Sequence, residues 1–209
     1  MNGRNNILNE ARRTFAPPLL AQLDTFTNLL LKWNRSFSLT SIPDDEVFMK
    51  LVAPSAWLGL EYEQERAGEV IDFGSGAGIP GIPMALANPS ARYTLVDSNQ
   101  KKIGFIKNCI ADRTLWEAPN ARAMLVRLNP EGGGEAPRAE RVVARASGSM
   151  SRVINHVNGC GATLFDFFKG RKESEAEIAE LAQKFPSAQV MERQTPEWFG
   201  DLVILRVTL

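Results

Sequence analysis

The stretch Val70-Ile71-Asp72-Phe73-Gly74-Ser75-Gly76-Ala77-Gly78 decides the fold class. The first four residues form a short strand that contains one acid, Asp72. The alternating glycines after them let the chain turn sharply where the strand ends. The segment after the glycines is compatible with a helix, and free N–H groups at a helix start attract anionic groups. We therefore expect a strand, a ligand-binding loop and a helix in succession.

Short strand-forming segments alternate with helical patterns on the C-terminal side of this loop. The strands are predicted at residues 91–96, 121–126, 141–144, 163–168, 188–192 and 202–207. The helices are predicted at residues 101–115, 149–158 and 173–185. This alternation is typical of an α/β fold with a doubly wound, mostly parallel sheet. In such sheets, ligands bind at the carboxyl ends of the strands, where the strand order reverses.

The first part of the chain has a different pattern. Apolar residues recur there at steps of three and four, which marks one face of a helix: Leu19, Leu23, Phe26, Leu30 and Trp33. A second helix is predicted from Asp44–Asp45 to about Leu60. We divide the chain into an N-terminal helical extension, residues 1–60, and an α/β core, residues 61–209.

Composition limits the classes of function. The 209 residues carry 24 basic and 24 acidic side chains, so no overall field attracts nucleic acid and any such partner must meet a local patch. The 2 cysteines and the single histidine form no metal-ligating pattern, and no apolar run approaches the ~20 residues of a membrane span. We expect a cytoplasmic, monomeric protein without a metal, a membrane span or a signal peptide.

The spacing of the glycines indicates which nucleotide the loop binds. A dinucleotide-binding loop has the pattern G-x-G-x-x-G, but Ile79 occupies the position of its third glycine and Gly78 comes one residue earlier. G-x-G-x-G after a strand with an acid resembles an adenosylmethionine-binding loop. Asp97 ends the next predicted strand, where a carboxylate can accept hydrogen bonds from both ribose hydroxyls. Dinucleotide binding and a tight turn without a ligand remain as alternatives.

The residues after the fourth predicted strand narrow the choice of methyl acceptor. Ala144-Arg145-Ala146-Ser147 stands where adenine amino-methylating enzymes have an Asn/Asp-Pro-Pro-aromatic tetrapeptide. Pyrimidine C5 methylation needs a cysteine nucleophile at a strand end, and neither Cys109 nor Cys160 lies there. Guanine N7 fits better, because its lone pair is free at neutral pH and no general base is needed. Arg145 is predicted to be functional and His156 structural.

The ordered motifs resemble those of a known family. They are Trp33-Asn34, Leu39-Thr40-Ser41, residues 71–108 with the block GSGAGIPGIP, Ala144-Arg145-Ala146 and Lys169-Gly170. This series is similar to the RsmG (GidB) family of bacterial methyltransferases that act on guanine N7 of 16S ribosomal RNA. The resemblance implies a Rossmann-like class I methyltransferase fold, S-adenosyl-L-methionine as the cofactor, and ribosomal RNA or a small-subunit precursor as the partner.

The resemblance also implies roles for single residues. The cofactor contacts it implies are Asp72, Gly74, Gly76, Gly78, Ile79, Asp97, Leu128, Asn129 and Arg145. Arg145 is also the implied catalytic residue. The predicted contacts to substrate RNA are Arg127 and Lys169, which match family positions, and Arg171, which belongs to a basic patch after the fifth predicted strand.

Several positions on the acceptor side depart from the family pattern. The family has His, Asp-Ser, Glu, Ser and a basic residue where this chain has Leu51, Pro54-Ser55, Asn129, Ala144 and Gly200-Asp201. Two other functions therefore stay open: a methyltransferase for another RNA site or a small molecule, and a cofactor-binding module without transfer activity.

Overall fold

The computed structural model describes residues 2–127 and 136–209. The α-helices are α1 (Asn2–Arg13), α2 (Pro17–Phe37), α3 (Ala53–Gln64), α4 (Gly81–Ala87), α5 (Gln100–Ala111), α6 (Met150–His156) and α7 (Arg171–Lys184). Single turns are the 3-10 helices η1 (Asp44–Glu46) and η3 (Glu197–Phe199) and the π-helix η2 (Phe48–Val52). The strands are β1 (Glu69–Phe73), β2 (Arg92–Asp97), β3 (Ala121–Leu125), β4 (Arg141–Arg145), β5 (Leu164–Gly170), β6 (Gln189–Glu192) and β7 (Leu202–Thr208).

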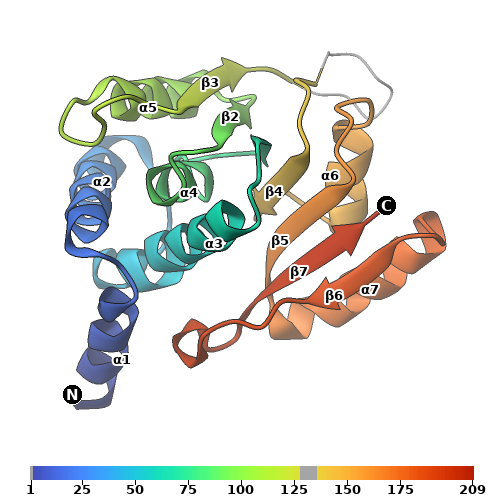
Figure 1. The fold of residues 1–209 in the computed structure, drawn as a ribbon, viewed down its shortest axis with the longest axis horizontal. Helices are drawn as coiled ribbons and strands as arrows, with labels where there is room; N and C mark the ends of the chain where they lie inside the picture. The colour runs from blue at the N-terminus through green and yellow to red at the C-terminus, as the bar shows by residue number, and fades with distance from the viewer. Residues whose placement is uncertain (1, 128–135) are drawn as a thin grey trace.

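The strands form one sheet in the order β3-β2-β1-β4-β5-β7-β6 (Figure 1). Strands β1 to β5 pair with one another in parallel, while β7 runs antiparallel to β5 and to β6. The order reverses between β1 and β4, where Phe73 pairs with Ala144. The prediction of a doubly wound, mostly parallel sheet is confirmed, and its switch point lies beside the glycine loop.

Two apolar clusters cover the two faces of this sheet. Because side chains alternate along a strand, Val70 and Val143 belong to the cluster packed under α2, α3, α4 and α5. Ile71 and Val142 belong to the other cluster, which contains residues of α6 and α7. The sheet is therefore the middle layer between two helical layers, and its carboxyl edge is left for a site.

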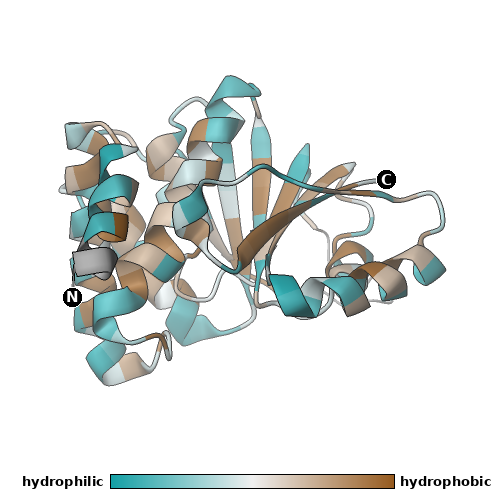
Figure 2. Ribbon diagram, turned by 90° about the horizontal axis from the view of Figure 1, so that it is seen from below, coloured by the Kyte–Doolittle hydropathy of each residue, from teal (hydrophilic) through white to brown (hydrophobic). Residues whose placement is uncertain are grey.

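The N-terminal helices pack closely on the core. Phe26 of α2 contacts Phe105 of α5, with ring centroids 6.4 Å apart, and both lie in one apolar cluster. Figure 2 shows these helices gathered at one end of the molecule, with both hydrophilic and hydrophobic residues along them. The predicted division at residue 60 falls inside α3, so the helical segment continues to Gln64. The division into two units stays a prediction.

The predicted second helix, Asp44 to Leu60, is confirmed as a continuous helical segment, but its first half is not α-helical. The chain forms η1 and η2 there, and α3 starts only at Ala53. Pro54 contributes to this change of helix type because proline has no N–H to bond the carbonyl of Lys50, four residues earlier. In the part of the chain that the structure describes, no helix combines the length and the apolar character needed to cross a membrane.

Candidate functional site

The glycine loop lies at the carboxyl end of β1, as the sequence predicted. Gly74, Gly76 and Gly78 have φ angles of 70°, 54° and 74°, which favour glycine. A Cβ atom on Gly74 would lie 2.6 Å from the Ser147 Oγ atom. Ser147 Oγ itself donates a hydrogen bond to the carbonyl of Phe73, at 2.7 Å. The loop after β1 therefore packs tightly against the loop after β4.

Asp97 joins the end of β2 to this loop. Its Oδ2 accepts a hydrogen bond from Gly76 N at 2.8 Å, and its Oδ1 accepts one from Asn99 N at 2.8 Å. The residue is 9% exposed and lines a cavity. Each carboxylate oxygen has a second lone pair, so Asp97 can hold the loop and still accept hydrogen bonds from two hydroxyl groups of a ligand.

Asp72 lies beneath the loop, fully buried. Its Oδ2 accepts a hydrogen bond from Gly81 N, the first residue of α4, at 2.9 Å, while its Oδ1 is buried without a hydrogen-bond partner among the described residues. Burial raises the pKa of this carboxyl from 3.8 to about 7. Asp72 thus supports the start of α4 and has one carboxylate oxygen that no described residue satisfies.

A cavity of about 920 Å³ opens at this edge of the sheet. Its walls come from the loops after β1, β2, β3 and β4, and include Phe73, Gly74, Val96, Asp97, Ser98, Lys102, Val126, Arg127, Ala146, Ser147 and Gly148. This volume is within the range of ligand sites in proteins, roughly 300–1,000 Å³. We call it the loop cavity, and it brings together Gly74 and Asp97, which the sequence predicts as cofactor contacts, and Arg127, which it predicts as an RNA contact.

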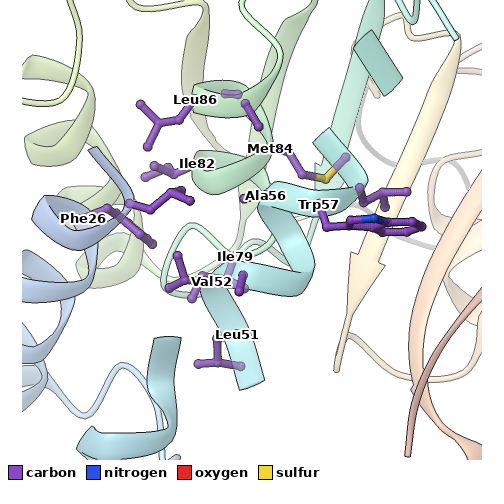
Figure 3. Packing of buried hydrophobic residues seen from close by; sticks show 14 of the residues in the cluster. Phe26, Leu51, Val52, Ala56, Trp57, Ile79, Ile82, Met84 and Leu86 are labelled. Atoms are coloured by element: carbon purple, nitrogen blue, oxygen red, sulfur yellow. The ribbon is translucent and has the colours of Figure 1, made fainter. Parts of the chain in front are cut away.

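Gly76, Gly78 and Arg145 do not line this cavity, and three further predicted contacts stand elsewhere or lie outside the described residues. Leu128 and Asn129 fall in residues 128–135, outside the part that the structure describes. The side chain of Ile79 packs in the apolar cluster with Val52 and Ile82 (Figure 3). A contact between Ile79 and a ligand would therefore come from its backbone or require a shift of its side chain.

His156 was expected to be structural and away from the site, and its position is a correction to that. It lines the loop cavity together with Arg152, one turn earlier in α6, and its ring centroid lies 5.7 Å from that of Phe73. Its Nδ1 atom is 2.7 Å from the Arg152 carbonyl oxygen. The sequence signal was present: α6 directly succeeds the loop after β4 and has only 7 residues, so its last residue, His156, still reaches the cavity at the carboxyl edge.

Arg145 ends β4 and is held by two contacts. Its Nη2 donates a hydrogen bond to the Lys50 carbonyl at 2.5 Å. This is the carbonyl that Pro54 cannot bond, because proline has no N–H. The Arg145 guanidinium also lies 5.4 Å from the centre of the Phe168 ring. Its Nη1 atom is buried without a hydrogen-bond partner in the described parts of the chain. Burial lowers the pKa of the guanidinium from 12.5 to about 10, so it stays charged at neutral pH. Arg145 therefore places a buried positive charge, with one nitrogen not hydrogen-bonded to the described residues, at the carboxyl edge of the sheet.

The two basic residues predicted as RNA contacts near the end of β5 have partners within the protein. Lys169 is 8% exposed, and its Nζ donates to Glu177 Oε1 at 2.7 Å and to the Gly148 carbonyl at 2.9 Å. Arg171 pairs with Glu192, with a distance of 2.9 Å from Nη2 to Oε1. Lys169 therefore holds the loop after β4, a role that sequence reasoning missed.

A family model described as "rRNA small subunit methyltransferase G" (GidB) matches residues 19–201. The chain belongs to the GidB family. A protein named ribosomal RNA small subunit methyltransferase G from Haemophilus influenzae (strain PittEE) is 32% identical over 210 residues, covering 96% of this chain and 97% of that protein. A protein of the same name from Anaeromyxobacter sp. (strain Fw109-5) is 37% identical over 171 residues, covering 79% of this chain and 76% of that protein. The resemblance seen in the motifs is confirmed.

Solved methyltransferases share the fold of this GidB family member. A methyltransferase from Geobacter sulfurreducens aligns with a TM-score of 0.60 at 15% identity and covers 93% of this chain and 92% of that one. An O-methyltransferase from Bacillus cereus, solved in complex with SAH, aligns with a TM-score of 0.62 at 14% identity and covers 88% and 91%. The prediction of a Rossmann-like class I methyltransferase fold is confirmed. Among residues 2–127 and 136–209, no three His, Cys, Asp or Glu side chains gather as metal ligands.

Proposed function

We propose that this protein transfers the methyl group of S-adenosyl-L-methionine to N7 of a guanine in small-subunit ribosomal RNA. Membership of the GidB family supports the reaction class, and the names of the relatives support the RNA. The observation that carries the proposal is the pairing of the glycine loop with Asp97 in one cavity. We expect the protein to act as a cytoplasmic monomer on a small-subunit precursor.

The residues of the loop cavity fit this cofactor. Asp97 has lone pairs for the two ribose hydroxyls, and Val96 and Val126 offer apolar surface to the adenine ring. The unsatisfied Oδ1 of Asp72 lies under the loop, where a positively charged amino group nearby would stabilise its ionised form. The cofactor supplies an activated methyl group on a sulfonium. We retain Gly74, Gly76, Gly78, Ile79, Leu128 and Asn129 as proposed contacts.

The reaction asks little proton chemistry of the protein. With the cofactor bound, the lone pair of guanine N7 would form the new C–N bond, the methyl–sulfur bond would break, and the positive charge would move to the purine. The protein must align N7 with that bond and exclude water. Arg145, at the end of β4 with its Nη1 unsatisfied, is placed to orient the base through O6 or a phosphate oxygen. We propose Arg145 as the catalytic residue, Arg127 and Arg171 as RNA contacts, and Lys169 as the support of the loop at Gly148.

The test is methyl transfer from tritiated S-adenosylmethionine to small ribosomal subunits isolated from cells that lack the gene. We expect incorporation at one guanine, located as N7-methylguanosine. Arg145→Ala should lower kcat about 100-fold, as expected when one aligned electrostatic donor is lost, whereas Arg113→Ala on the exposed surface should not. Transfer to metabolites but not to subunits would refute the proposal, and so would cofactor binding without any transfer.

A further inference from the structure

A second cavity, of about 770 Å³, is lined by Arg145, whose neighbour in the chain, Ala146, lines the loop cavity. Its walls are mostly apolar and include Ile42, Met49, Trp198 and Phe199. Its polar lining includes Arg145 and Asp201. Asp201 precedes β7, and its backbone carbonyl accepts a hydrogen bond from Arg171 N at 2.9 Å, which fixes this turn beside the end of β5.

The strand order places these groups in a row along one edge of the sheet. Gly74 directly succeeds β1, Arg145 ends β4, and Asp201 precedes β7, which is the second strand beyond β4. Neighbouring strands are about 4.8 Å apart, and Arg145 is level with Phe168 and Ile204, so Asp201 also lies three residues, about 10 Å, further along the strand direction. The two backbones are therefore roughly 14 Å apart, and a purine between the two side chains, with a hydrogen bond of about 3 Å on each side, fits this span.

We propose that the second cavity holds the acceptor guanine, with Asp201 accepting hydrogen bonds from its N1–H and 2-amino groups. This inference rests on the proposed function. Around a guanine ring the atoms run N7, O6, N1 and N2, and the row in the protein runs from the loop cavity through Arg145 to Asp201. N7 then faces the methyl donor, O6 faces the Arg145 guanidinium, and the donor edge of the base faces the carboxylate.

The second cavity is lined by charges of both signs: Asp45, Glu46 and Asp201 together with Lys50 and Arg145. Glu46 pairs with Lys50 at 2.6 Å, so the preference for guanine is argued from the edge of the base and not from the total charge of the cavity. Guanine offers two donors on the edge that meets Asp201, whereas adenine offers an acceptor, N1, that a carboxylate repels. The apolar walls at Trp198 and Phe199 suit the faces of a ring.

The same contact assists the reaction. As the C–N bond forms at N7, the ring becomes positive and N1–H becomes a stronger donor. A hydrogen bond to a carboxylate therefore strengthens in the transition state, which lowers the barrier and not only the substrate affinity. Arg145 alone would oppose the positive ring, and Asp201 offsets that repulsion.

The first experiment compares Asp201→Asn with Glu197→Gln in the tritium assay on small subunits. Both changes remove one exposed carboxylate from the same turn, but Glu197 does not line the second cavity. We expect kcat/KM to fall about 10- to 100-fold for Asp201→Asn, mostly in kcat. It should stay within about twofold of wild type for Glu197→Gln. The melting temperature and the calorimetric affinity for S-adenosylhomocysteine should be unchanged in both.

The second experiment uses small subunits reconstituted with inosine, which lacks the 2-amino group, at the mapped guanine. Wild type should lose about tenfold in kcat/KM on inosine, and Asp201→Asn should treat the two bases alike. Equal kcat/KM for Asp201→Asn and Glu197→Gln, or an unchanged preference for guanine in Asp201→Asn, would overturn the assignment. Absence of transfer by wild type would instead refute the proposed function, so the two failures are distinguishable.

Discussion

Two groups of buried charges lie at opposite edges of the sheet and differ in how completely they are paired with other residues. Near the amino ends of β4 and β5, an ionic cluster joins α3 to the sheet through Tyr62, Glu65, Arg141, Asp166, Arg193 and Arg206. Every charged member has an oppositely charged partner: Arg206 contacts Asp166 at 2.7 Å, and Arg193 contacts Glu65 at 2.8 Å. Burial alone would raise the pKa of Glu65, but hydrogen bonds from Arg141 and Arg193 lower it to about 2.

At the carboxyl edge, the buried charges are incompletely satisfied. Asp72 has a buried Oδ1 and Arg145 a buried Nη1 without partners in the described part of the chain. Burial shifts the pKa of Asp72 up and that of Arg145 down, so the charged form of each is disfavoured. The paired cluster stabilises the architecture, while the unsatisfied groups keep hydrogen-bonding capacity for a ligand.

The largest expected effect comes from breaking the ionic cluster. Asp166→Asn leaves Arg206 and Arg193 without their fully buried carboxylate, and removing one partner of a buried pair costs about 3–5 kcal/mol. Urea denaturation should show this loss, and the folded variant should bind S-adenosylhomocysteine like wild type. Glu192→Gln, in the exposed pair with Arg171, should cost under about 1 kcal/mol. A similar cost for both would contradict the distinction between the edges.

The free energy of unfolding should depend on pH through Asp72, at the carboxyl edge of the sheet. Below pH 3.8, Asp72 is protonated in both the folded and the unfolded state; between that value and about 7 the folded state keeps a proton that the unfolded state has lost. The free energy of unfolding should therefore fall as pH rises through this window, by up to roughly 4 kcal/mol, and level off above pH 7. Denaturation of wild type and Asp72→Asn across pH 5–8 measures this contribution. Parallel curves for the two proteins would disprove it.

A smaller effect is expected at the ribose contact. Asp97→Ala removes the carboxylate proposed to accept two hydrogen bonds, which should weaken S-adenosylhomocysteine binding by about 1–3 kcal/mol. Calorimetric titration measures this loss, and Glu117→Ala on the exposed surface is the control. Unchanged affinity in Asp97→Ala would remove Asp97 from the proposed cofactor site.

The smallest effect is expected at Glu177, which forms an ion pair near the carboxyl edge of the sheet. Glu177 of α7 pairs with Lys169 and accepts a hydrogen bond from Met150 N at 3.0 Å, so it holds the loop between β4 and α6. Glu177→Gln should cost about 1 kcal/mol of stability and lower kcat about threefold. Glu175→Gln, on the exposed side of the same helix, should change neither. A loss of stability with unchanged kcat would make Glu177 purely structural.

Much of this edge was predictable from the chain alone. The strand before Gly74, the glycines with their left-handed backbone, and Asp97 at the end of the next strand are local signals, because each depends on residues close in sequence. Arg127 follows β3, so the predicted alternation of strands and helices also places it at this edge, and it lines the loop cavity. The helix across Asp44 to Leu60 is present, but its first half forms η1 and η2 and not an α-helix, since Pro54 lacks an N–H for the helical ladder.

Long-range packing decided the rest. No local pattern shows that Lys169 would meet Glu177, or that Ile79 would turn into the apolar cluster. The hydrogen bond from Arg145 to the Lys50 carbonyl joins residues 95 positions apart. By itself, the sequence determined the succession of strand, loop and helix at the glycines and the resemblance to one family, and it predicted the class of nucleotide that the loop suits. Only the tertiary structure decided which charges are neutralised by partners and which stay available, because that depends on contacts between segments whose approach no local periodicity encodes.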